Sequence, residues 1–155
     1  MIGTTFKIYL PRFEAETAQV PSGEAAGKRP TGTETILLVE DDEAILNLGK
    51  MILEELGYTV LAAPAPRHAI HLVEDHPADI HLLITDVVMP EMNGRELAEQ
   101  LSANRPDLKC LYMSGYTADV IANSGILDEG VNLIQKPFGR NELAASVRQV
   151  LDRLE

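Results

Sequence analysis

Several features that mark particular protein classes are scarce in this sequence of 155 residues. The single cysteine, Cys110, excludes an internal disulfide and a cysteine-rich zinc site. Basic side chains are outnumbered, with 13 Lys and Arg against 24 Asp and Glu, for a net charge of −11. This balance argues against a general nucleic-acid binder, which needs a basic face, and against docking on anionic lipid. We therefore expect neither nucleic acid nor direct membrane contact.

Long hydrophobic runs are also missing. No apolar run approaches the roughly 20 residues of a membrane-spanning helix, and the N-terminus lacks the pattern of a signal peptide. A lone cysteine suits a reducing compartment, so we expect a cytoplasmic protein. With 45% hydrophobic residues, the chain can still bury the core of one domain of ordinary size.

Charge and composition change near residue 33. Residues 1–33 carry a net charge of +1, whereas residues 34–155 carry nine basic and 21 acidic side chains, for −12. Residues 13–33 nearly lack large apolar side chains, so burial cannot offset their ordering entropy, and we interpret them as a linker. Ahead of the linker, residues 5–10 consist largely of β-formers and end at Pro11, which predicts one strand.

From residue 34 onward, short apolar runs alternate with segments of helical periodicity. This alternation predicts a parallel sheet with helices on both faces. Strands are expected at residues 36–39, 58–62, 80–85, 108–113 and 132–135. Helices are expected at residues 43–56, 67–74, 95–103 and 141–154, and residues 118–130 are ambiguous because glycines interrupt them.

The spacing of apolar residues predicts which helix faces are buried. In the first helix, Ile45, Leu48, Ile52 and Leu56 form a stripe, and Gly57 is expected to cap the C-terminal end. The last helix carries its apolar side chains on one face at Leu143, Val147, Val150, Leu151 and Leu154.

Polar side chains follow four of the five predicted strands. In a parallel sheet of order 2-1-3-4-5, the first and third strands are neighbours, so Asp41 and Asp86 would face each other. Clustered carboxylates repel unless a cation intervenes, and Mg²⁺ suits such oxygen ligands. The residues at these strand ends are Glu40, Asp41, Asp42, Asp86, Ser114 and Lys136.

A carboxylate nucleophile, a cation site, a hydroxyl and an ammonium group together suit phosphoryl transfer. Asp86 can form an acyl phosphate, and Mg²⁺ with Lys136 can neutralise charge on the transferred group. Taken one at a time, these residues also have simpler interpretations: Asp41 or Asp42 as a helix N-cap, and Ser114 as a turn residue.

Four segments carry a family resemblance. ILLVEDDEAILNL, LLITDVVMPEMNGREL, LYMSGYT and LIQKPF resemble the signature segments of the response-regulator receiver domain over residues 34–155. The resemblance implies a (βα)5 flavodoxin-like α/β fold with five parallel strands in the order 2-1-3-4-5. It also implies that Asp86 accepts a phosphoryl group from a phosphohistidine on a partner, and that Ser114 and Lys136 bind the phosphate.

The same resemblance implies the metal ligands and one backbone feature. Mg²⁺ would be held by Asp41, Asp86 and the Val88 carbonyl directly, and by Glu40 through water. The Lys136–Pro137 bond is expected to be cis, which an X–Pro bond permits.

The sequence departs from the family pattern near the site. Leu133 stands where the family usually has Tyr or Phe, which puts a coupled ring movement in doubt. Val88 and Tyr116 flank the path of an attacking water, and apolar Val88 offers that water no hydrogen bond. We therefore hypothesise that this pair tunes the lifetime of the phosphoryl group.

The N-terminal strand suggests a larger context. GTTFKIYLP resembles the closing strand of a histidine-kinase ATP-binding domain. We therefore interpret residues 1–12 as the remnant of such a domain, ahead of a linker and a receiver, as in a hybrid histidine kinase that can be membrane-anchored. The chain lacks the ATP-binding motifs and the phosphorylatable His segment, so we do not expect it to phosphorylate itself from ATP.

The expected partner is a histidine kinase or a histidine phosphotransfer domain, either as donor or as the next step of a phosphorelay. A dimer would use the face formed by helix 4, strand 5 and helix 5, the usual switching surface of the family. The main alternative is a receiver fold used only for docking, without phosphorylation. A phosphatase would need a second acid or base after Asp86, and a flavin phosphate would be repelled by the acidic residues after the first strand.

Overall fold

The apolar runs of the sequence become the strands of one parallel sheet. In the computed structural model, which describes residues 31–76, 79–116 and 131–153, the strand order is β2-β1-β3-β4-β5, as predicted. The strands are β1 (Thr35–Val39), β2 (Thr59–Ala63), β3 (Leu82–Asp86), β4 (Lys109–Ser114) and β5 (Leu133–Gln135). The predicted strand at residues 5–10, most of the predicted linker and residues 118–130 lie outside the described residues.

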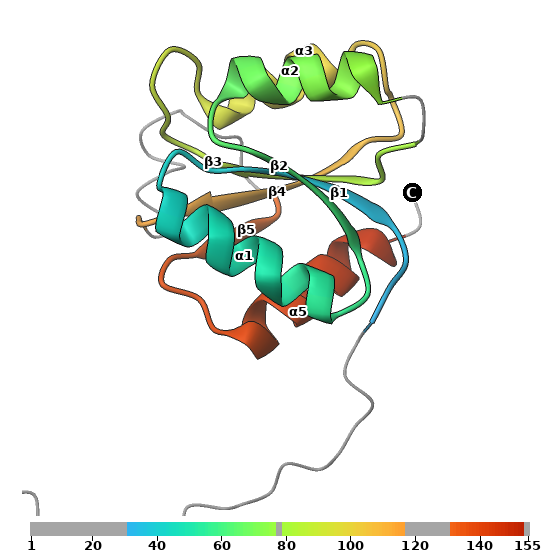
Figure 1. Cartoon of the computed structure of the whole chain (residues 1–155), viewed down its shortest axis with the longest axis vertical. Coiled ribbons are helices and arrows are strands. Elements are labelled where there is room, and N and C mark those ends of the chain that lie inside the picture. The colour runs from blue at the N-terminus through green and yellow to red at the C-terminus, as the bar shows by residue number, and fades with distance from the viewer. Residues whose placement is uncertain (1–30, 77–78, 117–130, 154–155) are drawn as a thin grey trace, which may run out of the picture.

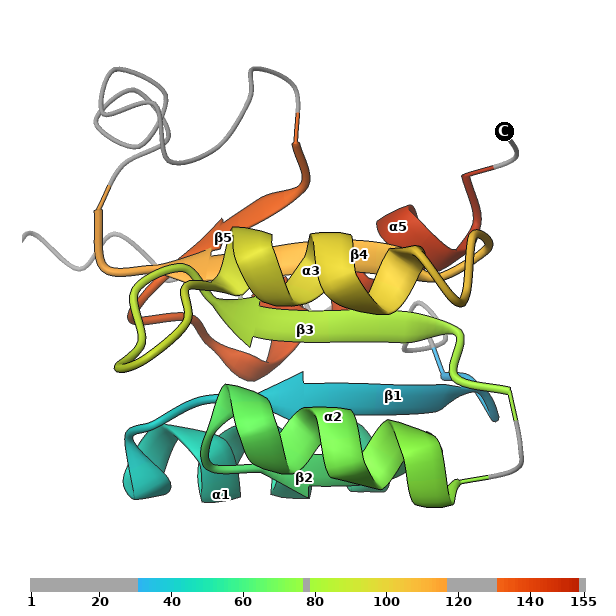
Figure 2. The ribbon, with the colours of Figure 1, turned by 90° about the horizontal axis from the view of Figure 1, so that it is seen from above.

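Helices cover both faces of the sheet. The helices are α1 (Glu43–Glu55), α2 (Pro66–Asp75), α3 (Gly94–Ser102) and α5 (Arg140–Leu151). Figure 1 shows α2 and α3 on one side and α1 and α5 on the other, and Figure 2 shows the strands side by side beneath α2 and α3. The predicted α/β architecture is confirmed.

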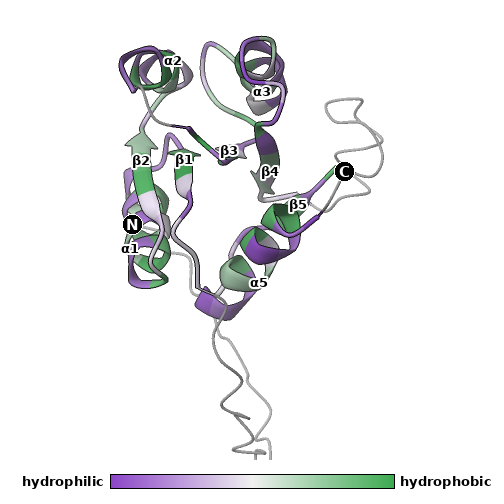
Figure 3. Cartoon of the chain, turned by 90° about the vertical axis from the view of Figure 1, so that its right-hand side faces the viewer, coloured by the Kyte–Doolittle hydropathy of each residue, from purple (hydrophilic) through white to green (hydrophobic). Residues whose placement is uncertain are grey.

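The uniformly apolar strands are explained by burial on both faces. Alternate residues of β1 enter two separate cores: Ile36 and Leu38 pack beneath α1 and α5, whereas Leu37 and Val39 pack beneath α2 and α3. Figure 3 shows the hydrophobic faces of the helices turned toward the sheet.

The predicted buried stripe of α1 was partly wrong. Leu48 is 45% exposed, whereas Leu46, Gly49 and Leu53 are buried beside Ile52. Apolar residues occupy most positions around this helix, so periodicity alone did not select the face. A side chain at Gly49 would press on Leu38 of β1, so close packing against the sheet decided it.

The predicted glycine cap of α1 is present. Gly57 has a φ of +97°, and its N–H donates to the Glu54 carbonyl at 3.0 Å. The next N–H, from Tyr58, donates to the Leu53 carbonyl at 3.2 Å. These two bonds close the helix in a Schellman motif and turn the chain into β2.

Candidate functional site

The polar residues predicted at the strand ends lie together at the carboxyl edge of the sheet. Because all five strands are parallel, the residue at or after the end of each strand reaches the same edge. Glu40 and Asp41 follow β1, Asp86 ends β3, Ser114 ends β4 and Lys136 follows β5. We call the residues Glu40, Asp41, Asp86, Ser114 and Lys136 the carboxyl-edge cluster.

Lys136 joins the acidic residues of this cluster. Its Nζ lies 2.7 Å from Asp86 Oδ2 and 2.9 Å from Glu40 Oε2. Glu40 is almost fully buried and Asp86 is buried, so the ammonium group compensates two carboxylates that water barely reaches. Lys136, which follows Glu40 by 96 residues in the sequence, thus supplies the positive charge beside the Glu40 carboxylate.

Burial and neighbouring charge alter the acidity of these groups. Burial raises the pKa of Glu40, the nearby Asp86 carboxylate raises it further, and the hydrogen bond from Lys136 only partly offsets these effects. For Lys136, burial acts to lower the pKa, but the hydrogen bonds to Asp86 and Glu40 outweigh it and raise the pKa. Lys136 therefore remains a cation at neutral pH.

The carboxylates also form a candidate metal centre. One oxygen from each of Glu40, Asp41 and Asp86 lies within 4.8 Å of the other two. Asp41 is exposed, so its carboxylate faces solvent at the mouth of the cluster. Three carboxylates balanced by a single ammonium form an oxygen-donor set with excess negative charge, which fits a hard divalent cation such as Mg²⁺.

The backbone around Asp86 is held by close contacts. The Val88 N–H lies 3.4 Å from Asp86 Oδ1, and the Thr85 hydroxyl donates to the Asp86 carbonyl at 3.0 Å. Gly94, the first residue of α3, lies so near that a Cβ there would overlap the Asp86 carbonyl oxygen. Its N–H closes the intervening loop by donating to the Val87 carbonyl at 3.1 Å. The glycine is thus needed for close approach.

The entry into α3 is also fixed locally. Asn93 and Glu96 form a capping box, in which each side chain accepts from the other's backbone N–H at 2.9 and 3.0 Å. We did not predict this capping box, although an Asn three residues ahead of a Glu at the start of an amphipathic helix is a recognisable signal.

Ser114 is buried on the far side of Asp86 from β1. Its hydroxyl accepts from the Tyr116 N–H at 2.9 Å, and its carbonyl accepts from the Lys136 N–H at 2.7 Å. The Lys136–Pro137 peptide bond is cis, as expected. The side chains of Val88 and Tyr116 are 57% and 61% exposed, and the backbone N–H groups of the two residues point at Asp86 and Ser114 of the cluster.

Two neighbouring acids take different positions. The Asp42 side chain accepts from the Ala44 and Ile45 N–H groups at 2.8 and 3.2 Å, so Asp42 is the N-cap of α1. Asp41 makes no such cap and belongs to the acidic group. Leu133, in the family's aromatic position, is half-buried in β5 opposite Tyr112.

A doubly covered parallel sheet of this order, with buried acids and a lysine at its carboxyl edge, defines a receiver-like α/β domain. The family model of the response regulator receiver domain matches residues 36–148, so the chain belongs to this family. It is a receiver domain of two-component signalling, a class that interacts with histidine kinases or phosphotransfer partners.

Relatives of known name are similar to this chain to different extents. "Sensor kinase CckA" of Brucella abortus is 36% identical over 158 aligned positions, which cover 97% of this chain and 17% of that protein. The chain thus spans about a sixth of the length of that kinase. "Response regulator receiver protein CpdR" of Brucella abortus is 32% identical over 75% of this chain and 95% of its own length.

Solved structures agree on the fold. The receiver domain from the hybrid histidine kinase CckA is 30% identical, with a TM-score of 0.64, over 76% of this chain and 99% of that structure. A CheY-like receiver domain protein from Methanospirillum hungatei JF-1 is 31% identical, with a TM-score of 0.65, over 78% of this chain and 95% of that structure. Among the described residues, no helix is long and apolar enough to cross a membrane.

Proposed function

We propose that Asp86 is the phosphoacceptor of this receiver domain. The observation that carries the proposal is the position of Lys136, whose ammonium group touches both Asp86 and Glu40 at the open edge of the sheet. The cation lies where the oxygens of a phosphorylated Asp86 would need a counter-charge. Ser114, buried beside Asp86 at the end of the next strand, would supply a hydroxyl to the same phosphoryl group.

The proposed step transfers a phosphoryl group from nitrogen to oxygen. A carboxylate oxygen of Asp86 forms the new bond to phosphorus, and the bond from phosphorus to the donor imidazole nitrogen breaks. The nitrogen keeps the bonding electron pair, and because the other ring nitrogen of the phosphohistidine carries a proton, the partner's histidine leaves as neutral imidazole. Lys136 and Ser114 then hold the phosphoryl oxygens.

The residues fit a resident Mg²⁺. Asp41 and Asp86 would bind the ion directly with the Val88 carbonyl, and Glu40 would bind it through water. When bound, the ion supplies positive charge to the phosphoryl oxygens. Before binding, three carboxylates share one ammonium group, which favours capture of a divalent cation.

The proposed donor is a histidine kinase or a histidine phosphotransfer domain in the cytoplasm, and the phosphoryl group could pass on in a relay. Similarity to the sensor kinase covers 97% of this chain, beyond the residues matched by the receiver model, and supports a hybrid-kinase context. In this proposal, residues 1–12 derive from a kinase ATP-binding domain, residues 13–33 are the linker and residues 34–155 are the receiver. Dimerisation would use the usual switching surface of the family, which includes β5 and α5.

The test is the intact mass of the chain after incubation with Mg²⁺ and acetyl phosphate, beside Asp86→Asn. We expect one added phosphoryl group on the parent chain and none on the variant. Asp107→Asn, which removes a carboxylate distant in sequence and outside the cluster, is the matched control and should be phosphorylated normally.

An absent adduct on the parent, together with no binding of Mg²⁺ or of beryllofluoride, would favour the docking module. An adduct on both the parent and Asp86→Asn would place the acceptor at another residue.

A further inference from the structure

The first residue of β1 and the residues just ahead of it form hydrogen bonds with segments distant in the sequence. The Gly32 N–H donates to the Leu56 carbonyl at 3.2 Å, and the Glu34 carbonyl accepts from Thr59 at 3.1 Å. The Thr35 N–H donates to Nδ1 of His81 at 3.1 Å. Residues 32–34 precede the span matched by the family model, so these contacts attach the incoming chain to the receiver.

Arg148 of α5 adds an ion pair to these attachments. Its Nη1 lies 2.8 Å from Glu34 Oε1 and 3.5 Å from the Tyr58 hydroxyl. Its Nε and Nη2 bind Asp152, one turn further along, with Nη2 at 2.6 Å. The guanidinium group therefore has partners on both sides of its fork. We call Glu34, Tyr58, Arg148 and Asp152 the amino-edge clamp.

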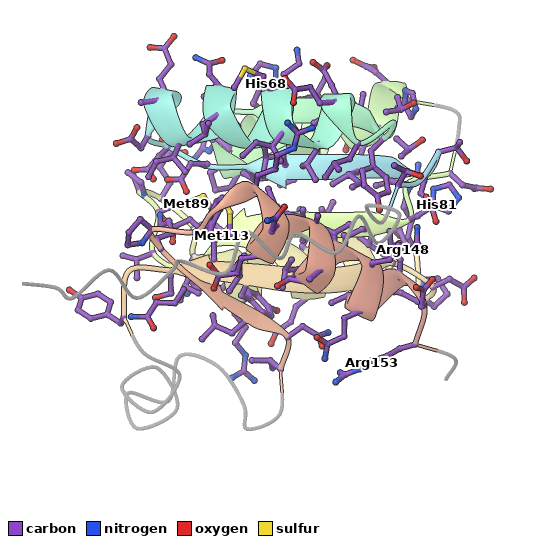
Figure 4. The ribbon with its side chains drawn as sticks, turned by 90° about the horizontal axis from the view of Figure 1, so that it is seen from below. His68, His81, Met89, Met113, Arg148 and Arg153 are labelled. Carbon is purple, nitrogen blue, oxygen red and sulfur yellow. The ribbon has the colours of Figure 1, made fainter. Side chains whose placement is uncertain are left out.

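The clamp is partly shielded from solvent. The side chains of Arg148 and Glu34 are 21% and 25% exposed, whereas the Arg67–Glu91 pair elsewhere is 77% and 56% exposed. Tyr58 is buried beneath the pair. Figure 4 shows Arg148 and His81 at one end of the molecule and Met89 and Met113 toward the other. The clamp is thus remote from the carboxyl-edge cluster.

One rigid element connects the two regions. Lys136, which holds Asp86 and Glu40, lies four residues before α5, and Phe138 between them packs on the core beneath α1 and α5. The 12 residues of α5 form a helix about 18 Å long that carries Arg148 near its end. A displacement of Lys136 can therefore reach Arg148 through residues 137–139 and the helix that follows them.

We propose that α5 couples the state of Asp86 to the chain ahead of β1 through the amino-edge clamp. This inference rests on the proposed function. When the Asp86 carboxylate becomes an acyl phosphate, Lys136 moves to the phosphoryl oxygens and its contact with Glu40 changes. The Arg148–Glu34 contact at 2.8 Å is already at optimal length, so displacement of α5 relative to β1 lengthens it and loosens the incoming chain.

Coupling of this kind is reciprocal. If occupation of the Asp86 site weakens the clamp, then weakening the clamp must strengthen occupation of the site by the same factor. This relation provides a test that a purely structural ion pair would not satisfy.

The experiment uses the full chain with Mg²⁺ and beryllofluoride, a phosphoryl mimic. Bound mimic is measured by fluorine NMR, and loosening is measured by hydrogen exchange at the Gly32 amide. We expect beryllofluoride to speed Gly32 exchange about three- to ten-fold in the parent. We expect Glu34→Gln to bind the mimic tighter by the same factor, and to lose most of the exchange response.

Two further variants separate the coupling from simple damage. Arg148→Lys keeps the positive charge but loses the planar guanidinium group that binds two partners at once. Its affinity for the mimic should lie between those of the parent and Glu34→Gln. Lys50→Gln removes an exposed ion pair on α1 and should change neither measurement. Bound mimic with unchanged Gly32 exchange and unchanged affinity in Glu34→Gln would overturn the coupling alone. No bound mimic in the parent would overturn the proposed function and the coupling with it.

Discussion

In the carboxyl-edge cluster three carboxylates share one ammonium group, whereas at the amino edge Lys109, Arg105 and Arg148 each have two or more acceptors. Lys109 donates to the Leu151 and Arg153 carbonyls at 2.8 and 2.6 Å, and so caps the end of α5. Arg105 donates to the Val73 and His76 carbonyls at the end of α2, both at 3.3 Å.

The cations at the amino edge stabilise the fold, whereas the excess negative charge of the carboxyl-edge cluster serves cation binding and chemistry. Cations at the ends of helices satisfy carbonyls that have no partner within the helix, and they favour the negative end of the helix dipole. The carboxyl edge instead keeps negative charge in excess, which costs stability in the metal-free protein and favours a cation. The following four experiments probe this contrast, from the largest expected effect to the smallest.

Removing Lys136, the cation of the carboxyl-edge cluster, should have the largest effect. In Lys136→Met, Glu40 and Asp86 face each other without compensation, and we expect the free energy of unfolding in metal-free buffer to fall by about 3 kcal/mol. The phosphorylation rate should fall at least about ten-fold, because one source of charge stabilisation is lost. Urea unfolding and rapid-mixing mass spectrometry measure the two effects.

Millimolar Mg²⁺ should restore much of the stability of Lys136→Met but not its phosphorylation rate. Lys50→Met, which removes an exposed lysine of α1, is the control. An equal free energy of unfolding for Lys136→Met and the parent would contradict this prediction. It would mean that the negative charges of Glu40 and Asp86 do not depend on Lys136 for compensation.

Substitution of Gly94 should disturb the same edge through the backbone. In Gly94→Ala, the added methyl group overlaps the Asp86 carbonyl oxygen, so α3 or β3 must shift. We expect a loss of about 1–3 kcal/mol in the free energy of unfolding, by the usual cost of overpacking. Gly115→Ala, where the methyl group meets nothing within 4 Å, is the matched control for stability. Equal losses in both variants would argue against the close approach.

Val88 should affect the lifetime of the phosphoryl group without affecting stability. Its side chain is 57% exposed beside the cluster, so Val88→Asn places an amide where it can hydrogen-bond an attacking water. We expect dephosphorylation to become a few-fold faster, an effect of about 1 kcal/mol on the barrier. Loss of phosphoprotein with time, measured by intact mass, checks it, with Val131→Asn as a control at another exposed valine. An unchanged lifetime would contradict the hypothesis that Val88 affects how long the phosphoryl group persists.

The amino edge should show the smallest effect, and only in acid. Burial acts to raise the pKa of Glu34, but the hydrogen bond and charge of Arg148, together with backbone hydrogen bonds, outweigh it and the net pKa is lowered from 4.5. A lowered pKa gives stability that is present above pH 4.5 and lost as the pH falls through the folded value. Arg148→Gln should therefore be less stable than the parent at pH 7, by about 1 kcal/mol or less, and the difference should shrink toward pH 3.

Urea midpoints at both pH values measure that difference. Because Glu34 and Arg148 remain partly exposed, 0.5 M salt should also reduce it at pH 7. A difference that grows as the pH falls would contradict the assigned direction of the Glu34 pKa.

The sequence predicted the carboxyl edge far better than the amino edge. Apolar runs followed by Glu40, Asp86 or Ser114 indicated parallel strands that end at one polar edge, and the described topology agrees. Arg148 carried no such signal, because its partner Glu34 lies 114 residues earlier in a segment with no apolar pattern. The periodicity of apolar residues does not indicate which charged residues, far apart in the sequence, will form an ion pair.

Local patterns by themselves determined the order of the elements, the glycine that ends α1 and the polar residues that follow the strands. Those features depend on neighbours a few residues apart, through hydrogen bonding and side-chain period. Tertiary structure alone decided which face of α1 is buried, that Lys136 lies between Glu40 and Asp86, and that Gly94 touches Asp86. These depend on packing between distant segments, where small shifts in position decide whether two atoms touch.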